Sequence, residues 1–202
     1  MKAKHSNNLS IFKKIIIVFF IILLICSIYF FMQNKKERTE SNISNNSDEQ
    51  TNSSVEVVEN INMPDKIENY NVLGKIVIDK VGIEQYILEV PNKEQTMEAL
   101  ELGVIKFYAP DFNLNEPGNF CIEGHNYQEI FGHLMNIEKD DTFYIIDKTN
   151  SKKVTYKIYD KYTVYPDNLD SLNQETNDKR EVTLITCTPG NLTRLIIKAR
   201  EI

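Results

Sequence analysis

The feature that most constrains the fold is a succession of short segments rich in β-branched and aromatic residues, each ended by a turn signal. Apolar and polar residues alternate in Leu73–Asp79, as in a strand with one buried face, and the pattern resumes in Ile83–Val90 after Val81-Gly82. Similar segments are Val104–Tyr108, Asn119–Glu123, Asp141–Asp147, Lys153–Tyr165, Val182–Cys187 and Thr193–Ala199. Seven or eight short strands predict an all-β barrel or sandwich.

Two stretches are typical of short helices. Glu94–Leu102 spaces its apolar residues at helical intervals, and Gly103 ends the pattern. Glu129–Met135 has room for one or two helical turns. Between them, Ala109–Asn119 is rich in Pro, Asp, Asn and Gly and is predicted to be a loop. The sequence shows neither a Gly-rich phosphate loop nor a Cys/His cluster with metal-ligand spacing.

The N-terminal part predicts a membrane anchor. Ile15–Met32 contains eighteen residues without a charge, which is long enough to cross a bilayer as a helix. A cleaved signal peptide is the alternative, because four lysines precede the run. The run is longer than the usual signal-peptide core, however, and it ends in bulky residues, so we favour an uncleaved span.

The lysines before the span favour a cytoplasmic N-terminus (residues 1–14) and an extracellular remainder. Residues 33–60 are mostly Ser, Asn, Thr and charged residues, which cannot bury enough apolar surface to offset the entropy of ordering, so they predict a flexible stalk. Residues 61–202 then form the globular domain. That domain has 16 Lys and Arg against 23 Asp and Glu, a net charge of −7. This charge argues against nucleic acid as a partner, since phosphate neutralisation needs a basic surface.

The last two predicted strands carry the strongest chemical signal. Cys187 ends one strand, Pro189-Gly190-Asn191 supplies a turn, and Arg194 opens the next strand. Paired strands lie about 5 Å apart, so the thiol and the guanidinium are expected on facing strands at one rim. Alternation places Arg194, Lys198 and Arg200 on the more polar face. Arg200 is the alternative to Arg194 as the functional arginine.

A cysteine nucleophile needs a proton partner, and the domain contains only two histidines. His125 follows a strand between Gly124 and Asn126, as site residues on loops commonly do. His133 lies in a predicted short helix and is interpreted as a surface residue. Cys121 is interpreted as a packed strand residue, although a disulfide between Cys121 and Cys187 stays open.

These residues together resemble the sortases, the cysteine transpeptidases of Gram-positive surfaces. The resemblance covers most of Leu73 to Arg200, and Asp140 stands where the family commonly has glycine. The matching motifs, in chain order, are GKIVIDKVGIEQYI, LELGVIKFY, PGNFCIEGHN, IFGHLMNIEKDDTFYI, VTLITC and TRLIIKAR.

The resemblance implies an eight-stranded β-barrel with two or three short helices, and it implies roles for four residues. Cys187 would attack the carbonyl between Thr and Gly of an LPxTG-like sorting signal and form a thioester. His125 would protonate the departing amine, and Arg194 would hold the substrate or its oxyanion. Thr186 would contact the substrate. The expected partners are LPxTG-type surface proteins and a cell-wall (peptidoglycan-precursor) amine acceptor.

Several alternatives stay open. A hydrolytic cysteine protease on the same scaffold would release the acyl group to water, and a non-catalytic binding module would use Cys187 structurally. Asp111 and Glu116 are possible Ca²⁺ ligands, but the six or more oxygens that Ca²⁺ needs cannot be assembled, so we expect neither metal nor cofactor. The single anchor and the absence of an evident lid favour a class A-like or class D-like enzyme over a pilin-polymerising one.

Overall fold

The structure is a computed structural model that describes residues 55–59, 62–108 and 113–202. The predicted cytoplasmic segment, the predicted anchor at 15–32 and most of the predicted stalk lie outside the described residues. Within the described part of the chain, no helix combines the length and the apolar character that a bilayer crossing needs.

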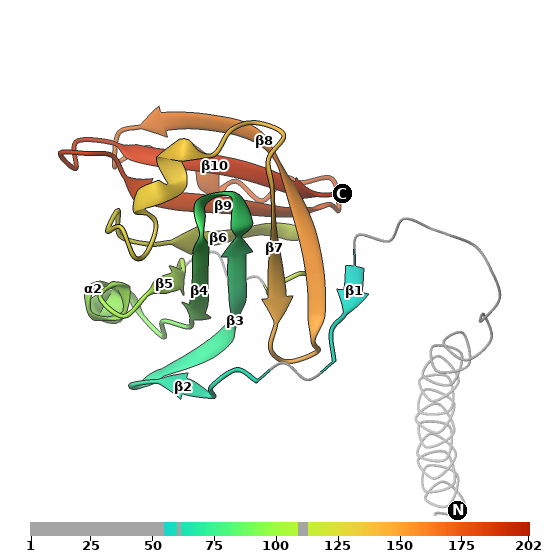
Figure 1. Cartoon of the computed structure of the whole chain (residues 1–202). Coiled ribbons are helices and arrows are strands. Elements are labelled where there is room, and N and C mark those ends of the chain that lie inside the picture. The colour runs from blue at the N-terminus through green and yellow to red at the C-terminus, as the bar shows by residue number, and fades with distance from the viewer. Residues whose placement is uncertain (1–54, 60–61, 109–112) are drawn as a thin grey trace, which may run out of the picture. The chain divides into compact units, whose positions relative to one another are not determined.

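Eight strands close into a barrel, as predicted (Figure 1). Around the barrel the order is β8-β10-β9-β6-β5-β4-β3-β7, and β7 closes the ring because it pairs with both β3 and β8. The β4–β5 and β6–β9 pairs are parallel and the others are antiparallel. The strands are β3 (Tyr70–Ile78), β4 (Ile83–Leu88), β5 (Val104–Lys106), β6 (Gly118–Glu123), β7 (Thr142–Asp147), β8 (Lys152–Val164), β9 (Arg180–Cys187) and β10 (Arg194–Glu201).

Two short strands lie outside this ring. β1 (Val55–Val57) pairs with the beginning of β8, and β2 (Lys66–Ile67) pairs with the beginning of β3. β1 belongs to the range predicted as stalk. The folded part therefore begins before the predicted boundary at Ile61, because Val55–Val57 pairs with β8 and Val55 packs against the barrel core.

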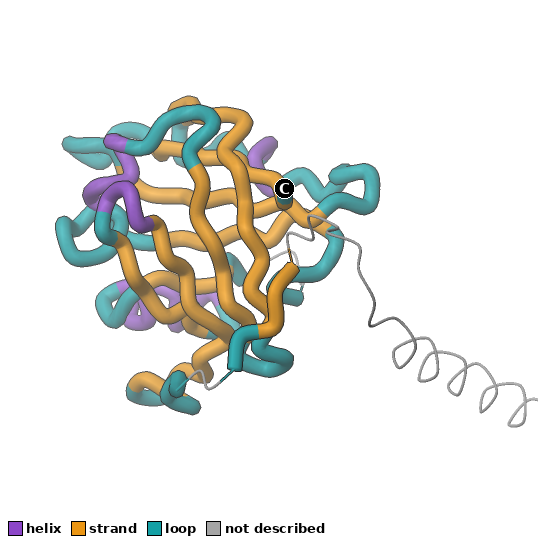
Figure 2. Tube along the Cα trace, turned by 45° about the vertical axis from the view of Figure 1, so that its right-hand side comes forward, coloured by secondary structure: helices purple, strands orange, loops and turns teal. Residues whose placement is uncertain are grey.

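The helical segments are short, and most are 3-10 turns. The predicted helix at Glu94–Leu102 consists of the 3-10 helix η2 (Lys93–Gln95) and the α-helix α2 (Thr96–Leu100). Asn92 caps this element by accepting a hydrogen bond from the Gln95 backbone amide. The other 3-10 helices are η1 (Asp79–Val81), η3 (Gly132–Asn136) and η4 (Asp170–Leu172). The tube view in Figure 2 shows how much of the described chain is strand.

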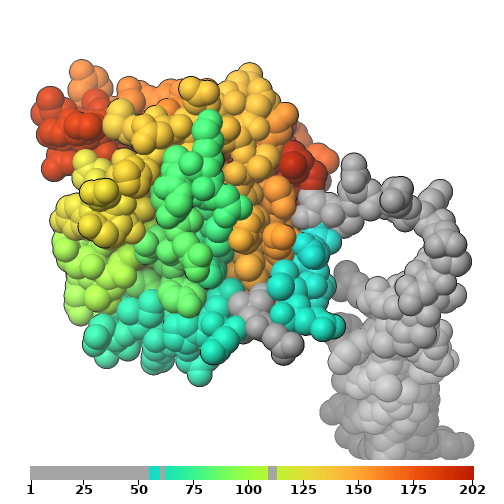
Figure 3. Space-filling view, in the orientation of Figure 1, coloured from blue at the N-terminus to red at the C-terminus, as the bar shows by residue number. Residues whose placement is uncertain are grey.

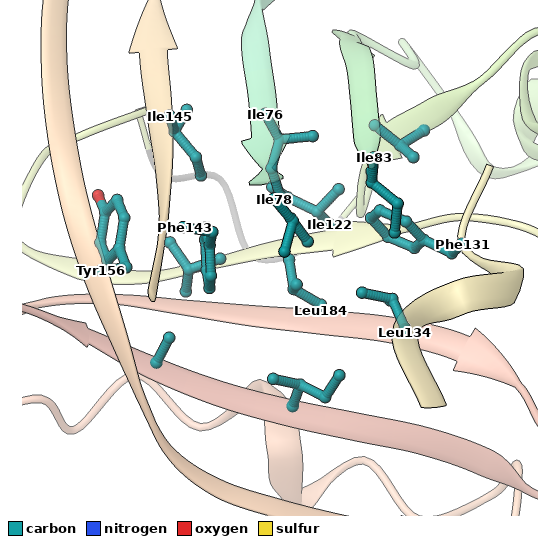
Figure 4. Close-up of a cluster of buried hydrophobic side chains, with 14 of the residues drawn as sticks. Ile76, Ile78, Ile83, Ile122, Phe131, Leu134, Phe143, Ile145, Tyr156 and Leu184 are labelled. Atoms are coloured by element: carbon teal, nitrogen blue, oxygen red, sulfur yellow. The ribbon is translucent and has the colours of Figure 1, made fainter. Parts of the chain in front are cut away.

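The barrel interior is filled by alternate side chains from every long strand (Figure 4). Phe143 and Tyr156 stack with ring centroids 5.6 Å apart, and Phe131 and Leu134 close one end from the η3 side. The Tyr156 hydroxyl donates to Asn115 Oδ1 at 2.9 Å, so the polar end of this buried ring is satisfied. A rigid, fully packed barrel of this kind holds strand ends in fixed positions, and these strand ends carry the candidate site.

Candidate active site

Cys187 and Arg194 form the last residue pair, or rung, of the β9–β10 ladder. The two residues are direct register partners in this antiparallel pair. The connecting hairpin is closed by the hydrogen bond from the Thr188 amide to the Thr193 carbonyl at 3.0 Å, and Gly190 supplies the positive φ of 83° that its turn requires. Both Cys187 and Arg194 are half-buried, and the hairpin projects from the surface beside them (Figure 3, red). The predicted thiol–guanidinium pairing at one rim is therefore present.

The end of β6 brings His125 beside the same rung. β6 runs parallel to β9 with Glu123 opposite Ile185, and the Gly124 amide continues the ladder by donating to the Ile185 carbonyl at 3.1 Å. One residue past His125, Asn126 Nδ2 donates to the Thr188 carbonyl at 3.4 Å. Contacts on both sides of His125 thus hold its backbone alongside Cys187, about one strand spacing away.

Gly124 is required for this close approach. A Cβ at this position would lie 2.8 Å from Phe131 Cδ2 and 3.0 Å from Val104 Cγ1, both of which are side chains of the packed core. Glycine lets the chain pass against Phe131 and turn towards the rim, and His125 follows directly. The GHN motif therefore has a packing reason for its glycine as well as a chemical reason for its histidine.

The imidazole of His125 is enclosed by residues that precede β5 and follow β6. Its Nε2 lies 3.2 Å from Glu101 Oε1, although the ring N–H does not align with that carboxylate as a hydrogen bond. The Tyr127 ring stacks on the imidazole with centroids 4.6 Å apart, and the Tyr127 hydroxyl lies 3.5 Å from the same Glu101 oxygen. Nε2 therefore faces Glu101, at the C-terminal end of α2, in this conformation.

The site also contains the carboxyl group of Glu123. Glu123 is half-buried on the outer face of β6, the face that Cys187 and Arg194 share on their own strands. Burial raises the pKa of the Glu123 carboxyl, while the charges of Arg194 and His125 oppose that rise. Glu123 thus adds a carboxyl group to a site whose other groups are a guanidinium, an imidazole and a thiol.

The structure separates the two candidate arginines. Nη1 of Arg194 is buried and has no hydrogen-bond partner within the described residues. Arg200 is opposite Glu181, six residues before Cys187 on β9, and forms an ion pair with that glutamate. Six residues of strand correspond to about 20 Å, which places Arg200 out of reach of the sulfur.

Thr186 lies on the opposite side of β9 from Cys187. Its side chain is 2% exposed, and its Oγ1 has no hydrogen-bond partner within the described residues. Because strand side chains alternate, Thr186 faces the barrel interior with Leu184. The predicted substrate contact of Thr186 stays a prediction, and in this conformation only its backbone is on the substrate side.

The second thiol takes no part in the site. Cys121 is opposite Thr183, four residues before Cys187 on the neighbouring strand, which is a separation of about 13 Å along β9. A disulfide needs Cα atoms within about 7 Å, and both cysteines are free. Burial raises the pKa of the Cys121 thiol to about 11. The alternative of a structural Cys121–Cys187 disulfide is therefore incompatible with this fold.

The remaining predicted candidates lie apart from the rung. His133 is half-buried in η3. Glu116 forms an ion pair with Lys152 at 3.7 Å, and Asp111 lies outside the described residues. Within the parts of the chain that the structure describes, no group of three or more acidic, Cys or His side chains could hold a metal ion.

Sequence reasoning missed two members of the site, Glu101 and Glu123. Glu123 could have been predicted from the sequence pattern, because it precedes His125 by two residues and therefore shares its face of the strand. Glu101 carried no such signal. It reaches His125 only because the parallel β4–β5 crossover through α2 brings that helix end to the rim.

Comparisons with known proteins agree on one family. The family model described as "Sortase domain" matches residues 76–202, and a sequence comparison with curated proteins found no match. The chain is similar to a sortase D5 transpeptidase from Clostridium perfringens, at 28% identity and a TM-score of 0.57, with 65% of this chain and 79% of that one covered.

Two further structures resemble the chain at lower identity. Sortase C-1 from Actinomyces oris is 26% identical with a TM-score of 0.58, covering 65% of this chain and 72% of that chain. Sortase C from Clostridium perfringens, solved with the C-terminal cell wall sorting motif, is 25% identical with a TM-score of 0.57, covering 65% and 71%. Since the family model spans more than half of the sequence, and the barrel closes as that family requires, the chain belongs to the sortase family.

Proposed function

We propose that this protein is a membrane-anchored cysteine transpeptidase. It cleaves an LPxTG-like sorting signal between Thr and Gly and transfers the acyl group to a cell-wall amine. The observation that carries the proposal is the shared rung: Cys187 and Arg194 are register partners, and the backbone of His125 is held beside them by hydrogen bonds on either side.

Chemistry at this rung follows from the three side chains. The Cys187 thiolate attacks the Thr carbonyl carbon, and the Arg194 guanidinium donates hydrogen bonds to the oxygen that gains negative charge. When the C–N bond breaks, His125 gives its proton to the departing glycine amine, and a thioester remains on Cys187. An amine then attacks the thioester, His125 accepts the proton of that amine, and the new amide leaves the free thiol behind.

The orphan donor on Arg194 supports this role. A buried guanidinium nitrogen without a partner costs free energy, on the order of 1–3 kcal/mol, and a shift of the Arg194 side chain towards a substrate carbonyl or oxyanion would relieve that cost. To transfer its proton, the imidazole of His125 would turn from the Glu101 carboxylate towards the sulfur. Such loosely aligned pairs are common in unliganded catalytic sites and tighten in the complex.

The proposal includes the location that the sequence predicts. Residues 15–32 would anchor the chain with its N-terminus in the cytoplasm, and the barrel would lie outside the cell, where sorting signals emerge. A class A-like or class D-like enzyme fits the described residues before the barrel. β1 pairs with the first residues of β8, whereas Arg194 pairs with the last, some ten residues or about 33 Å away, so β1 cannot cover Cys187 as a lid.

The test uses the full chain with a library of LPXTG peptides, varied at the third position, and a short glycine peptide as amine acceptor. We expect a new amide product and, without acceptor, a peptide mass added to the intact protein that is lost on hydroxylamine treatment. The Cys187→Ala variant should show neither, with an unchanged unfolding midpoint. Failure of the wild-type chain to cleave any library member would overturn the proposal.

Two other outcomes favour the alternatives. Hydrolysis that stays the sole reaction at saturating acceptor would identify a protease on the sortase scaffold. A Cys187 that resists alkylation in the native protein would argue for a non-catalytic module, because a nucleophile at this rung has to be accessible.

A further inference from the structure

The loop between β8 and β9, residues 165–179, is fastened to the outer face of the barrel by side chains from three strands. The carbonyl oxygen of Ser171, in η4, accepts hydrogen bonds from Asn119 Nδ2 at 2.9 Å and from Lys198 Nζ at 3.1 Å, and the Thr183 hydroxyl lies 3.3 Å from it. These three side chains come from β6, β10 and β9, respectively. Side chains from three strands of the sheet's outer face thus converge on one backbone carbonyl of the loop.

The same side chains also bond to one another and to the next residues of the loop. Thr183 Oγ1 accepts from Lys198 Nζ at 2.8 Å and donates its proton to Asn119 Oδ1 at 2.6 Å. Gln174 exchanges two hydrogen bonds with the Asn119 backbone, at 2.8 and 3.0 Å. Asn119, Ser171 and Thr183 are all buried. Every member is satisfied, which makes the network rigid.

Lys198 is the unusual member of this network. It makes no ion pair within the described part of the chain, and burial lowers the pKa of its ammonium group. An apolar side chain would fill this position without the desolvation cost that a charged group carries. What the ammonium adds is two directed donors, to Ser171 and Thr183, that hold the loop.

The fastened loop borders the catalytic rung. Leu172, next to Ser171, packs on a cluster of Cys121, Ile185 and Ile196 on the outer face. Ile185 and Ile196 are register partners one rung of that face before Cys187 and Arg194, which corresponds to about 7 Å along the strands. A peptide whose carbonyl lies at Cys187 and that extends along this face would meet Leu172 and the loop that carries it.

We propose that Lys198 is a positioning residue for the substrate: it clamps the Ser171 carbonyl so that the β8–β9 loop forms a preformed wall of the sorting-signal cleft. This inference rests on the proposed function. A preformed wall does not have to be ordered when the peptide binds, so the clamp contributes to the KM for the peptide and little to the rate of the chemical step.

The test replaces Lys198 with methionine, which keeps the aliphatic stem and removes the donors. With the full chain and the best library peptide, we expect Lys198→Met to raise KM about 10-fold, as expected for the loss of hydrogen bonds from a charged group, and to change kcat less than about 2-fold. Lys198→Arg should recover most of the affinity, since a guanidinium can donate to both acceptors. Arg200→Met is the matched control, because Arg200 lies on the same strand and face but bonds to Glu181 instead of the loop.

Hydrogen exchange provides a readout that needs no substrate. Lys198→Met should accelerate amide exchange in residues 169–174 at least 10-fold, while β9 and β10 keep wild-type protection. Thr183→Val, which removes one acceptor of the ammonium without changing the side-chain shape, should act in the same direction. If the wild-type chain is inactive, the proposed function fails while exchange still tests the clamp. An unchanged KM with unchanged loop exchange would overturn the inference, as would an equal rise in KM for Arg200→Met.

Discussion

Cys187 and Arg194 face each other across the last rung of β9 and β10. Because six residues connect them through a tight hairpin, their relative position depends on local pairing and hardly on the rest of the barrel. The imidazole is different, since His125 reaches the same place only through the parallel pairing of β6 with β9. The thiol and the guanidinium are thus a local unit, and the imidazole is brought to it by the fold.

Replacing Arg194 and Arg200 separately should show that only Arg194 is needed for activity. Arg194→Ala removes the guanidinium opposite Cys187 and is expected to lower kcat/KM at least 100-fold, as loss of an oxyanion donor does in other enzymes. Arg200→Ala removes an ion pair with Glu181 about 20 Å away and should leave kcat/KM within about 2-fold. Steady-state kinetics with an LPXTG peptide makes the comparison. Equal losses in both variants would contradict the pairing of Arg194 with Cys187 and of Arg200 with Glu181.

Gly124→Ala should damage activity more than stability. The added methyl would meet Phe131 and Val104 at 3.0 Å or less and would push the end of β6 outward, which moves His125 relative to Cys187. We expect a cost of about 1–3 kcal/mol in the free energy of unfolding, typical of overpacking, with at least a 10-fold drop in kcat. Urea unfolding and single-turnover kinetics measure the two effects. A variant that is destabilised but fully active would show that Gly124 does not position His125.

Thiol reagents should distinguish Cys121 from Cys187, the two cysteines of the globular domain. At pH 8 and under native conditions, iodoacetamide is expected to modify the half-buried Cys187 and to spare Cys121, which is 4% exposed. In 6 M guanidinium chloride the Cys121 thiol should become reactive as well. Peptide mapping by mass spectrometry identifies the labelled residue. Native labelling of Cys121 at a rate comparable to Cys187 would mean that the outer face opens.

The buried thiol of Cys121 should also make the fold sensitive to alkali. Its pKa is raised from 9.0 to about 11 by burial, so above pH 9 the unfolded chain loses this proton while the folded chain keeps it. Stability is then lost between about pH 9 and pH 11, by on the order of 2 kcal/mol. Cys121→Ala should remove this part of the slope while leaving a constant difference below pH 8. Parallel slopes for the two proteins in denaturant titrations between pH 7 and pH 11 would contradict the assignment.

Asp140 adopts a positive φ of 74°, the backbone region that glycine prefers. Its carboxylate forms an ion pair with Lys157, but both side chains are largely exposed, so this pair contributes little. We expect Asp140→Gly to raise the free energy of unfolding by about 0.5 kcal/mol, because relief of backbone strain exceeds the loss of the pair. Asp140→Ala is the control, since it keeps the strain and should lower stability. A less stable glycine variant would show that the ion pair outweighs the strain.

Sequence by itself determined the features that depend on neighbouring residues. Alternation in Val182–Cys187 and Thr193–Ala199 predicted two strands, and Pro189-Gly190-Asn191 predicted their turn, so the opposition of Cys187 and Arg194 followed from period-two geometry. The same alternation puts Leu195 and Ile197 on the face opposite Arg194, and the structure has both in the barrel core.

Only the tertiary structure decided which distant segments meet. The parallel register of β6 with β9 places His125 at the rung, and the crossover through α2 brings Glu101 within 3.2 Å of its ring. The convergence of Asn119, Thr183 and Lys198 on the Ser171 carbonyl likewise needs three strands and a loop in one arrangement. Such contacts depend on how the sheet closes, and closure is fixed by the packing of the whole core rather than by any local pattern.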